Sequence, residues 1–234
     1  HVGWASLGWG TDTFIGGAGA ERVDGGRMDD NLSGGGGNDL LLGGMGADVI
    51  SGGTGNDGLY GDYGNDVLLQ QGGDRIFAGH SDDRIELADL AFALVDGGAG
   101  RDTLATGALS GTINLGAVFA SNRVTGIEGV DLGTAGRAAI AAANAGAALD
   151  GLRIDGSGSA ALTLAGSWTD AGQQVIGGFS YTLWRTGSTT ISVRAGVTVT
   201  LAASLPADAR GLDAVAGGAA APVLADEPTF ALAN

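Results

Sequence analysis

The sequence predicts an all-β fold, in which a β-solenoid of nine-residue repeats over residues 1–105 is followed by a β-rich capping domain. Two observations support this prediction. Glycine and aspartate recur every nine residues through the first half, and self-similarity at a fixed short period is typical of stacked solenoids. Short alternating apolar segments, bounded by turn residues, then continue through residues 106–203 without that period. Residues 204–234 lie outside both patterns, and we expect a flexible C-terminal tail.

The period is clearest over residues 34–66, which read GGGGNDLLL, GGMGADVIS, GGTGNDGLY and GDYGND. Paired glycines permit backbone conformations with positive φ, which tight turns require. The aspartate adds a hard anionic oxygen of the kind that Ca²⁺ prefers. A large apolar residue follows two places after each aspartate and is expected to face the core of a short strand. These apolar residues are Leu41, Ile50, Leu59 and Leu68. Each nonamer therefore encodes a turn, a candidate ligand and a core residue.

The nine-residue period already begins at Leu7 and places Asp12, Glu21 and Asp30 in the position of the acid. It is interrupted over residues 70–87, where it would place two arginines, Arg75 and Arg84, in that position. A shift of one residue would instead use two aspartates and turn two isoleucines inward. The residues concerned are Asp74, Asp83, Ile76 and Ile85.

Residues 88–96 lack the turn glycines, so we expect this turn to serve packing and not metal binding. Residues 97–105 restore the pattern with Asp102, in phase with Asp66. Residues 7–105 therefore divide into eleven units of nine.

The second half predicts a β-solenoid-like continuation or cap with irregular spacing. The expected strands lie at 112–115, 129–132, 152–154, 162–164, 181–183, 190–193 and 197–201. Alanine-rich residues 137–149 favour one short helix, and residues 204–208 resemble a helix N-terminus with Pro206 in its first turn. Trp168, Tyr181 and Trp184 would fit either a ligand-binding surface or the core. Aromatic residues at strand spacing favour the core.

The composition favours a cation-binding protein. The chain has 47 glycines, 3 prolines and 44% hydrophobic residues, and its glycine excess is periodic, which argues against disorder. The net charge of −15 argues against nucleic acid or an anionic membrane as a partner. Most of the acidic residues lie among the nonamers. No cysteine is present, and no apolar run reaches the length of about 18 residues needed for membrane insertion.

Enzyme signatures are absent from the sequence. Neither HExxH nor GxSxG occurs, and the GxGxxG match at residues 53–58 arises from the repeat and precedes a strand instead of a helix. The chain has two histidines, of which His80 is expected to be a solvated turn residue. We therefore predict that the chain is not an enzyme, with no catalytic residues and no organic cofactor.

Residues 7–105 resemble the RTX, or haemolysin-type, calcium-binding repeat, and the units at 34–42, 43–51, 52–60 and 97–105 match its pattern throughout. The resemblance implies a right-handed parallel β-roll with two nonamers per coil, and several Ca²⁺ ions held between units i and i+2. It assigns one site to Gly34, Gly36, Asp39, Gly53, Gly55 and Asp57, and its neighbour to Gly43, Met45, Asp48, Asp62, Gly64 and Asp66. Further candidate ligands are Asp12, Asp30, Gly44, Gly46, Gly98, Gly100 and Asp102.

Several units depart from this pattern. Asp62 replaces the second glycine, Met28 replaces the fourth position of its unit, and Glu21 is one methylene longer than aspartate. The alternative is that these acids only cap turns, as aspartate often does, and for Asp74 and Asp83 both interpretations stay open. Stacking carboxylates along an edge without a cation is unfavourable, which favours metal binding over capping.

The resemblance also implies a biological setting. It suggests a calcium-binding structural domain that folds on secretion by a type I secretion machinery, within an extracellular adhesin or surface-layer protein. The segments at 124–132 and 152–168 resemble modules that follow such repeats in large bacterial surface proteins. The alternative is the export and folding domain of a secreted hydrolase, such as a protease or lipase. Residues 204–234 match the composition of an uncleaved type I export signal, and end-to-end self-assembly of the solenoid is a further possibility.

Overall fold

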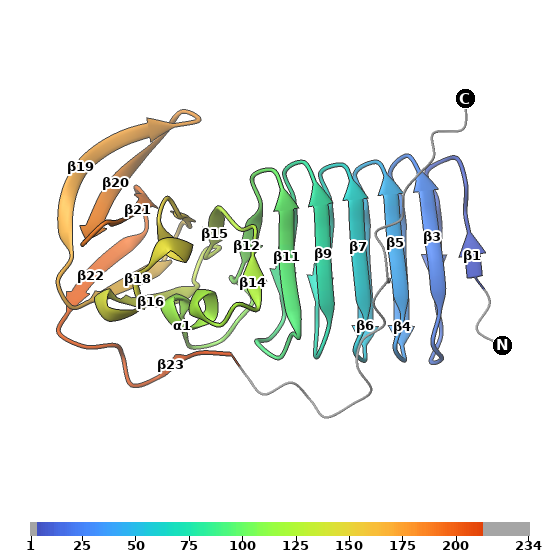
Figure 1. Cartoon of the computed structure of the whole chain (residues 1–234), viewed down its shortest axis with the longest axis horizontal. Helices are drawn as coiled ribbons and strands as arrows, with labels where there is room; N and C mark the ends of the chain where they lie inside the picture. Colours follow the sequence, from blue (N-terminus) through green and yellow to red (C-terminus); the bar gives the residue numbers. More distant parts are fainter. Residues whose placement is uncertain (1–3, 213–234) are drawn as a thin grey trace.

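The first half of the chain forms an elongated β-roll, and the second half closes one end of it (Figure 1). The computed structural model describes residues 4–212, so the prediction of a flexible tail lies mostly outside the described residues. Successive strands of the roll alternate between two parallel sheets, which makes two nonamers per coil. The predicted all-β parallel β-roll is therefore confirmed.

Along the roll, the odd-numbered strands from β1 to β11 belong to the first sheet and the even-numbered strands from β2 to β12 to the second. The strands of the first sheet, in spatial order, are β1 (Trp4–Ser6), β3 (Arg22–Arg27), β5 (Leu40–Met45), β7 (Gly58–Tyr63), β9 (Arg75–His80), β11 (Leu94–Ala99) and β14 (Val124–Thr125). The second sheet begins with β2 (Thr13–Ile15), β4 (Asn31–Gly36), β6 (Val49–Thr54), β8 (Val67–Gln70), β10 (Arg84–Leu87) and β12 (Thr103–Ala105). It continues through β15 (Gly129–Asp131) and β17 (Arg153–Asp155). Strand pairing thus crosses residue 105 in both sheets.

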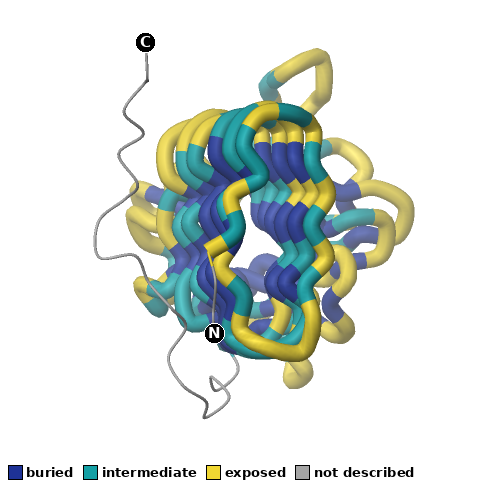
Figure 2. Tube along the Cα trace, turned by 90° about the vertical axis from the view of Figure 1, so that its right-hand side faces the viewer, coloured by how far each residue is buried: buried dark blue, intermediate teal, exposed yellow. Residues whose placement is uncertain are grey.

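The apolar residue of each nonamer faces the interior of the roll, as its period predicts. In the second sheet, Leu32 pairs with Ile50, and Ile50 with Leu68. These side chains are fully buried. Figure 2 looks along the roll and shows buried strand segments on its long sides, with exposed turns between them. Because a strand alternates its side chains between faces, the neighbours of each core residue point away from this interior.

The interruption at residues 70–87 is a shift by one residue. Leu59 pairs with Ile76 and Leu68 with Ile85, and both isoleucines are fully buried. The unshifted period, with Arg75 and Arg84 in the acid position, is therefore wrong. The reason is packing, because the unshifted period would place the charged Glu86 in the core position that Ile85 occupies.

The turn over residues 88–96 serves packing, as its lack of glycines predicts. Leu90, Phe92 and Val95 are fully buried there. Asp89 accepts hydrogen bonds from the backbone N–H groups of Ala91 and Gly72. Its side chain therefore stabilises a turn that has no glycine pair.

The cap adds a third, five-stranded parallel sheet to the solenoid. Its strands, in spatial order, are β22 (Thr198–Ala202), β18 (Ala161–Ala165), β16 (Arg137–Ala141), β13 (Thr112–Asn114) and β23 (Ala209–Arg210). A short helix, α1 (Leu115–Ala120), follows β13 and is capped by the Asn114 side chain, which accepts from the Ala117 N–H at 3.1 Å. One continuous apolar cluster extends from the roll into the cap.

Two helix predictions in the cap are wrong. The alanine-rich residues form strand β16 and two single 3₁₀ turns, η1 (Ala142–Asn144) and η2 (Ala147–Leu149). Ala138, Ala139 and Ile140 are buried in β16, so tertiary packing overrides the helix propensity of alanine. Residues 204–208 form a turn that leads into β23, and no helix begins there.

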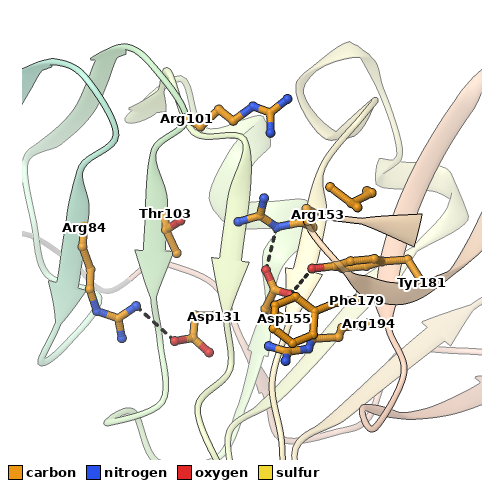
Figure 3. Close-up of a pocket in the computed structure, with 11 residues that line it drawn as sticks. Arg84, Arg101, Thr103, Asp131, Arg153, Asp155, Phe179, Tyr181 and Arg194 are labelled. Atoms are coloured by element: carbon orange, nitrogen blue, oxygen red, sulfur yellow. Dashed lines mark hydrogen bonds and ion pairs between the residues drawn. The ribbon is translucent and has the colours of Figure 1, made fainter. Parts of the chain in front are cut away.

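The second sheet ends in an antiparallel meander instead of further parallel coils. It consists of β19 (Thr169–Ile176), β20 (Phe179–Thr186) and β21 (Thr189–Arg194), of which β21 pairs with β17. Trp168 is buried in the core and Trp184 is partly buried against it, in agreement with the core interpretation. Tyr181 is also buried, but it lies outside this apolar cluster and lines a pocket (Figure 3). The meander closes an end that would otherwise expose unpaired parallel backbone.

Candidate metal centre

Two columns of carboxylates, here called ladders, follow the edges of the roll. The first ladder contains Asp12, Asp30, Asp48, Asp66, Asp83, Asp102 and Glu128. The second ladder contains Glu21, Asp39, Asp57 and Asp74. Within each ladder, one carboxylate oxygen accepts a hydrogen bond from the backbone N–H of the preceding member, at 2.7–2.9 Å. The nine-residue repeat therefore brings the predicted acids together in two rows.

In four units the residue before the ladder acid bonds in the opposite direction; these residues are Asp29, Asn38, Asn65 and Asp82. Asn38 Oδ1 accepts from the Asn56 N–H at 3.0 Å, and Asp29 Oδ1 accepts from the Ala47 N–H at 2.8 Å. These side chains reach the following coil, whereas the ladder acids reach the preceding one. The turns are thus tied to both neighbours, which fixes the height at which each carboxylate lies.

The second oxygen of most ladder acids is buried and has no hydrogen-bond partner among the described residues. This holds for every member except Asp74 and Glu128. A buried carboxylate oxygen without a partner is costly, because it has lost water and gained nothing in exchange. The oxygens concerned lie inside the roll edge, where a cation would compensate them.

Position one of each nonamer, counted from its first glycine, forms a cradle around this oxygen. A Cβ atom placed on Gly34 would collide with Oδ2 of Asp39 and lie 2.7 Å from the carbonyl oxygen of Gly52. Gly43 and Gly52 face Asp48 and Asp57 in the same way. At these three positions glycine leaves the space that the carboxylate occupies, whereas the shifted unit of Asp83 has Ala78 at position one. The same position brings a carbonyl of the next coil toward that carboxylate.

The direction of the backbone carbonyls decides which of them share one gap between coils. Positions two and four have positive φ, as at Gly53 and Gly55, and their Cα atoms face the carbonyl oxygens of Gly35 and Gly37. The carbonyl of Thr54, at position three, points the other way and accepts from the Gly37 N–H at 2.9 Å. Positions two and four of one unit therefore face positions one and three of the unit on the following coil.

This geometry is the reverse of the carbonyl pairing that the resemblance to the RTX repeat implies. The gap between units 34–42 and 52–60 receives carbonyls from Gly35, Gly37, Gly52 and Thr54. The resemblance instead pairs the carbonyls of Gly34 and Gly36 with those of Gly53 and Gly55. Those carbonyls point into the adjoining gaps. The neighbouring gap follows the same rule. There the carbonyl of Gly46 faces the Cα atom of Gly64, and the carbonyl of Tyr63 accepts from the Gly46 N–H at 2.9 Å, whereas the resemblance pairs Gly43 and Met45 with Asp62 and Gly64.

The ladder extends the same arrangement to units that depart from the repeat. Between Asp83 and Asp102, the carbonyls of Gly79 and Ser81 face the Cα atoms of Gly98 and Gly100. Asp83 retains a buried oxygen without a hydrogen-bond partner, which favours metal binding over simple turn capping at this residue.

Asp74 behaves differently and matches the capping alternative. Its Oδ1 accepts from the Asp57 N–H at 2.9 Å, and its Oδ2 accepts from the Gln71 N–H at 2.9 Å. Both oxygens are therefore engaged by protein donors. The second ladder ends here, where the glycine-free turn around Asp89 replaces the next cradle.

Glu128 is a ladder member that the sequence analysis missed. Its Oε2 accepts from the Asp102 N–H at 2.9 Å, and it lies 26 residues further along the chain. The carbonyl of Gly126 faces the cradle of Gly97. The insertion that contains α1 hides this unit from a nine-residue search. The signal that remains is a glycine two residues before the acid and a core residue, Val130, two residues after it.

Burial strongly perturbs the ladder carboxylates. Desolvation, followed by the nearby carboxylates of Asp66 and Asp30, raises the pKa of Asp48 to about 7. Desolvation, together with Asp66 and Asp102, raises the pKa of Asp83 to about 8. The pKa values of Asp39, Asp66 and Asp102 rise to about 6, again chiefly through burial. These groups resist ionisation in the apo protein, and a divalent cation would supply the missing positive charge.

In the turns of the roll, three non-glycine residues have positive φ. Met28, Asp62 and Ser81 have φ values of 73°, 71° and 87°. Asp62, which replaces the second glycine of its unit, is therefore in a strained backbone conformation. Glycine adopts this conformation freely, whereas other residues pay a conformational cost.

The donor set fits calcium in chemical type. It consists of carboxylate and carbonyl oxygens, which are the ligands of a hard cation that accepts six to eight of them. Within residues 4–212, no three acidic or histidine side chains converge on one point. A site in this roll must therefore be completed by backbone carbonyls, and the gaps between coils provide them.

Comparison with known families agrees with this geometry. The model of the RTX calcium-binding nonapeptide repeat matches four stretches, residues 7–41, 24–59, 42–69 and 94–113. No curated protein matches the sequence. The four matched stretches cover most of the roll, together with its junction to the cap.

Proposed function

Residues 7–113 carry RTX calcium-binding nonapeptide repeats, and we propose that the chain is a structural module that folds around calcium after secretion. Such repeats bind Ca²⁺ at multiple sites. The observation that supports the proposal most directly is the row of buried carboxylate oxygens without partners in both ladders. Without calcium these oxygens oppose folding, and with calcium they stabilise the roll, so binding free energy becomes folding free energy.

Each gap between coils would hold one ion through the carbonyls described above and the two ladder acids on its edge. Between units 34–42 and 52–60, these acids are Asp39 and Asp57. The ion supplies positive charge where two carboxylates would otherwise repel each other. The protein positions this ligand, because the hydrogen bond from the Asp39 N–H to Asp57 Oδ1 holds the Asp57 carboxylate at the gap.

The dependence on calcium suits export as an unfolded chain. A roll that requires abundant calcium stays unfolded where calcium is scarce and folds where it is plentiful. RTX repeats are typical of secreted proteins, and within residues 4–212 no helix is long and apolar enough to span a membrane. We place the module in an extracellular protein of the adhesin or surface-layer kind, exported by a type I machinery that recognises residues 204–234. A catalytic role is not part of this proposal.

Circular dichroism during a calcium titration tests the folding step. In chelator we expect low β content, followed by a cooperative gain as calcium rises toward millimolar concentration. Magnesium should replace calcium poorly, because it requires a tighter octahedral set of ligands. An unchanged spectrum and melting temperature in chelator would contradict the proposal.

Deletion of residues 204–234 tests the export step separately. The truncated chain should fail to leave cells that carry a type I machinery, while its calcium-induced folding in vitro is retained. Secretion of the truncated chain at full yield would show that the signal lies elsewhere.

A further inference from the structure

The outer faces of the two sheets of the roll differ in exposure. Leu40 on β5 and Val49 on β6 occupy the same position in consecutive nonamers, directly after the ladder acid. Leu40 is only 2% exposed, whereas Val49 is 39% exposed. Leu42 is also 2% exposed, and Leu41 between the two leucines faces the interior of the roll. Because side chains alternate along a strand, Leu40 and Leu42 point outward and yet are buried.

These outward leucines belong to an apolar patch that is separate from the core inside the roll. The patch consists of Leu40, Leu42 and Tyr60, with Phe77 packed against them. Leu42 pairs with Tyr60 and Tyr60 with Phe77, whose rings stack at 4.9 Å between centroids. Strand β5 packs against β3 and β7 in its own sheet and against β4 and β6 across the roll. Within residues 4–212, no helix or strand lies over the outer side of this patch (Figure 1).

Two polar atoms that border the patch are buried as well, without a hydrogen-bond partner among the described residues. One is Oδ1 of Asp24, which pairs with Leu42, and the other is Nε of Arg75, which pairs with Gly58. The first is an acceptor and the second a donor. Each is costly to bury unless a partner satisfies it. A polypeptide backbone carries N–H donors and C=O acceptors and can satisfy both, so these atoms favour a peptide as the cover.

The chain supplies a peptide segment close to this sheet. Gly211, next to the last described residue, lies against Ala117 of α1, and α1 precedes β14, the last strand of the first sheet. The described chain therefore ends beside the first sheet. From β14 to β5 the sheet crosses four strand spacings, about 19 Å. The 22 residues from 213 to 234 span up to about 70 Å when extended, so they reach the patch easily.

Residues 213–234, here called the C-terminal segment, also match the patch in composition. Their large apolar residues are Val215, Val223, Leu224, Phe230 and Leu232. The segment contains acidic residues, among them Asp226 and Glu227, and no lysine, arginine or histidine. Arg22 and Arg75 lie in the same row of paired residues as Leu40 and form no ion pair with a described residue. The acids of the segment carry the charge that these two arginines lack.

We propose that the C-terminal segment docks on the outer face of the first sheet in the folded protein and covers the patch of Leu40, Leu42, Tyr60 and Phe77. The docking site exists only in the folded roll, because three strands build it. A tethered segment acts at an effective concentration of about 1 mM, which favours it over a second copy of the chain at micromolar concentration. The site is separate from the calcium ladders and does not depend on the export proposal.

Cysteine accessibility in the full chain tests the cover, because the sequence has no cysteine of its own. In calcium, Leu40→Cys should react with a maleimide at least about tenfold more slowly than Val49→Cys, since the reaction requires the cover to open. Val49→Cys is the matched control, at the same repeat position on the exposed face. Circular dichroism in calcium checks that each variant is folded, and Leu42→Cys replaces Leu40→Cys if that variant is not. Equal reaction rates on the two faces would overturn the proposal.

Polar substitutions in the C-terminal segment identify the occupant. They are Val223→Ser, Leu224→Ser, Phe230→Ser and Leu232→Ser, combined in the full chain. The rate at Leu40→Cys should then rise toward that at Val49→Cys, while the rate at Val49→Cys stays the same. Protection of Leu40→Cys that survives these substitutions would overturn the proposal, and protection that increases with protein concentration would assign the face to a second copy. Neither rate depends on secretion, so a failure of the export proposal is distinguishable from a failure of this one.

Discussion

The backbone N–H of Asp48 donates a 2.8 Å hydrogen bond to Oδ1 of Asp66, one coil further along the roll. The same bond links Asp30 to Asp48 at 2.7 Å. Each ladder carboxylate therefore lies between two coils, with one oxygen fixed by backbone and the other left for a cation. This relationship leads to predictions that separate metal-binding acids from capping acids.

Asp48 and Asp74 should respond differently to loss of charge. Asp48→Asn removes an anionic ligand that borders two gaps, so we expect fewer bound calcium ions and a loss of about 3 kcal/mol in unfolding free energy in calcium. Asp74→Asn should leave the calcium stoichiometry unchanged, because both Asp74 oxygens already accept protein hydrogen bonds. Calcium-binding calorimetry and thermal melts of both variants provide the measurement. Equal losses of stoichiometry would contradict the distinction.

Position-one glycines should not tolerate alanine. In Gly52→Ala the new methyl group would collide with the Asp57 carboxylate, so we expect weaker calcium binding and a lower melting temperature. Gly146→Ala is a matched control in the cap, because its φ is −149° and no atom lies within 4 Å of the added carbon. That control should be neutral or stabilising by about 0.4–1 kcal/mol. Similar melting temperatures for the two variants would disprove the cradle.

Acid should partly replace calcium in folding the roll. Burial raises the folded-state pKa values, to about 6 for Asp39 and about 8 for Asp83, above the ordinary 3.8. A carboxyl with a raised folded pKa contributes stability that is complete below pH 3.8 and is lost as the pH rises through about 6 to 8. In chelator, β content should therefore increase as the pH falls from about 8 to about 5.

The pH dependence should change sign when calcium is present. Protons and calcium compete for the same oxygens, so the apparent calcium affinity should fall as the pH is lowered through that range. Circular dichroism and calcium titrations at several pH values measure both effects. A chelated protein that loses β structure on mild acidification would show that the ladder acids are not protonated on folding.

Glu128 should act only at the last gap. Glu128→Gln removes the charge of the terminal ladder member beside Asp102, so we expect weaker binding at one calcium site and little change elsewhere. Asp170→Asn, on exposed strand β19, controls for the loss of one negative charge. A titration identical to that of the control would place Glu128 outside the metal array.

The repetitive half of the fold follows closely from the sequence, because turn, ligand and core recur at fixed spacing. Asp39 and Asp57, for example, occupy the ladder positions that their period predicts. The directions of the carbonyls did not follow in the same way. They depend on the sign of φ at each turn residue, which glycine leaves open.

The cap was harder to predict because no repeat constrains it. In β16, alanine has a helix propensity that burial between β13 and β18 overrides. Glu128 escaped detection because the spacing from Asp102 is 26 residues, whereas spacings within the roll are 17–19.

The bond from Asp102 to Glu128 gives the roll a defined starting template. Glu128 belongs to the cap, whose sheets are held by an apolar core instead of by carboxylates. The first coil of the array can therefore dock on an existing surface, and we expect this to lower the nucleation cost of the solenoid. Each calcium-loaded coil then exposes the edge that the next one needs. We therefore expect growth of the roll to be polar, proceeding from the residues nearest the cap toward Trp4.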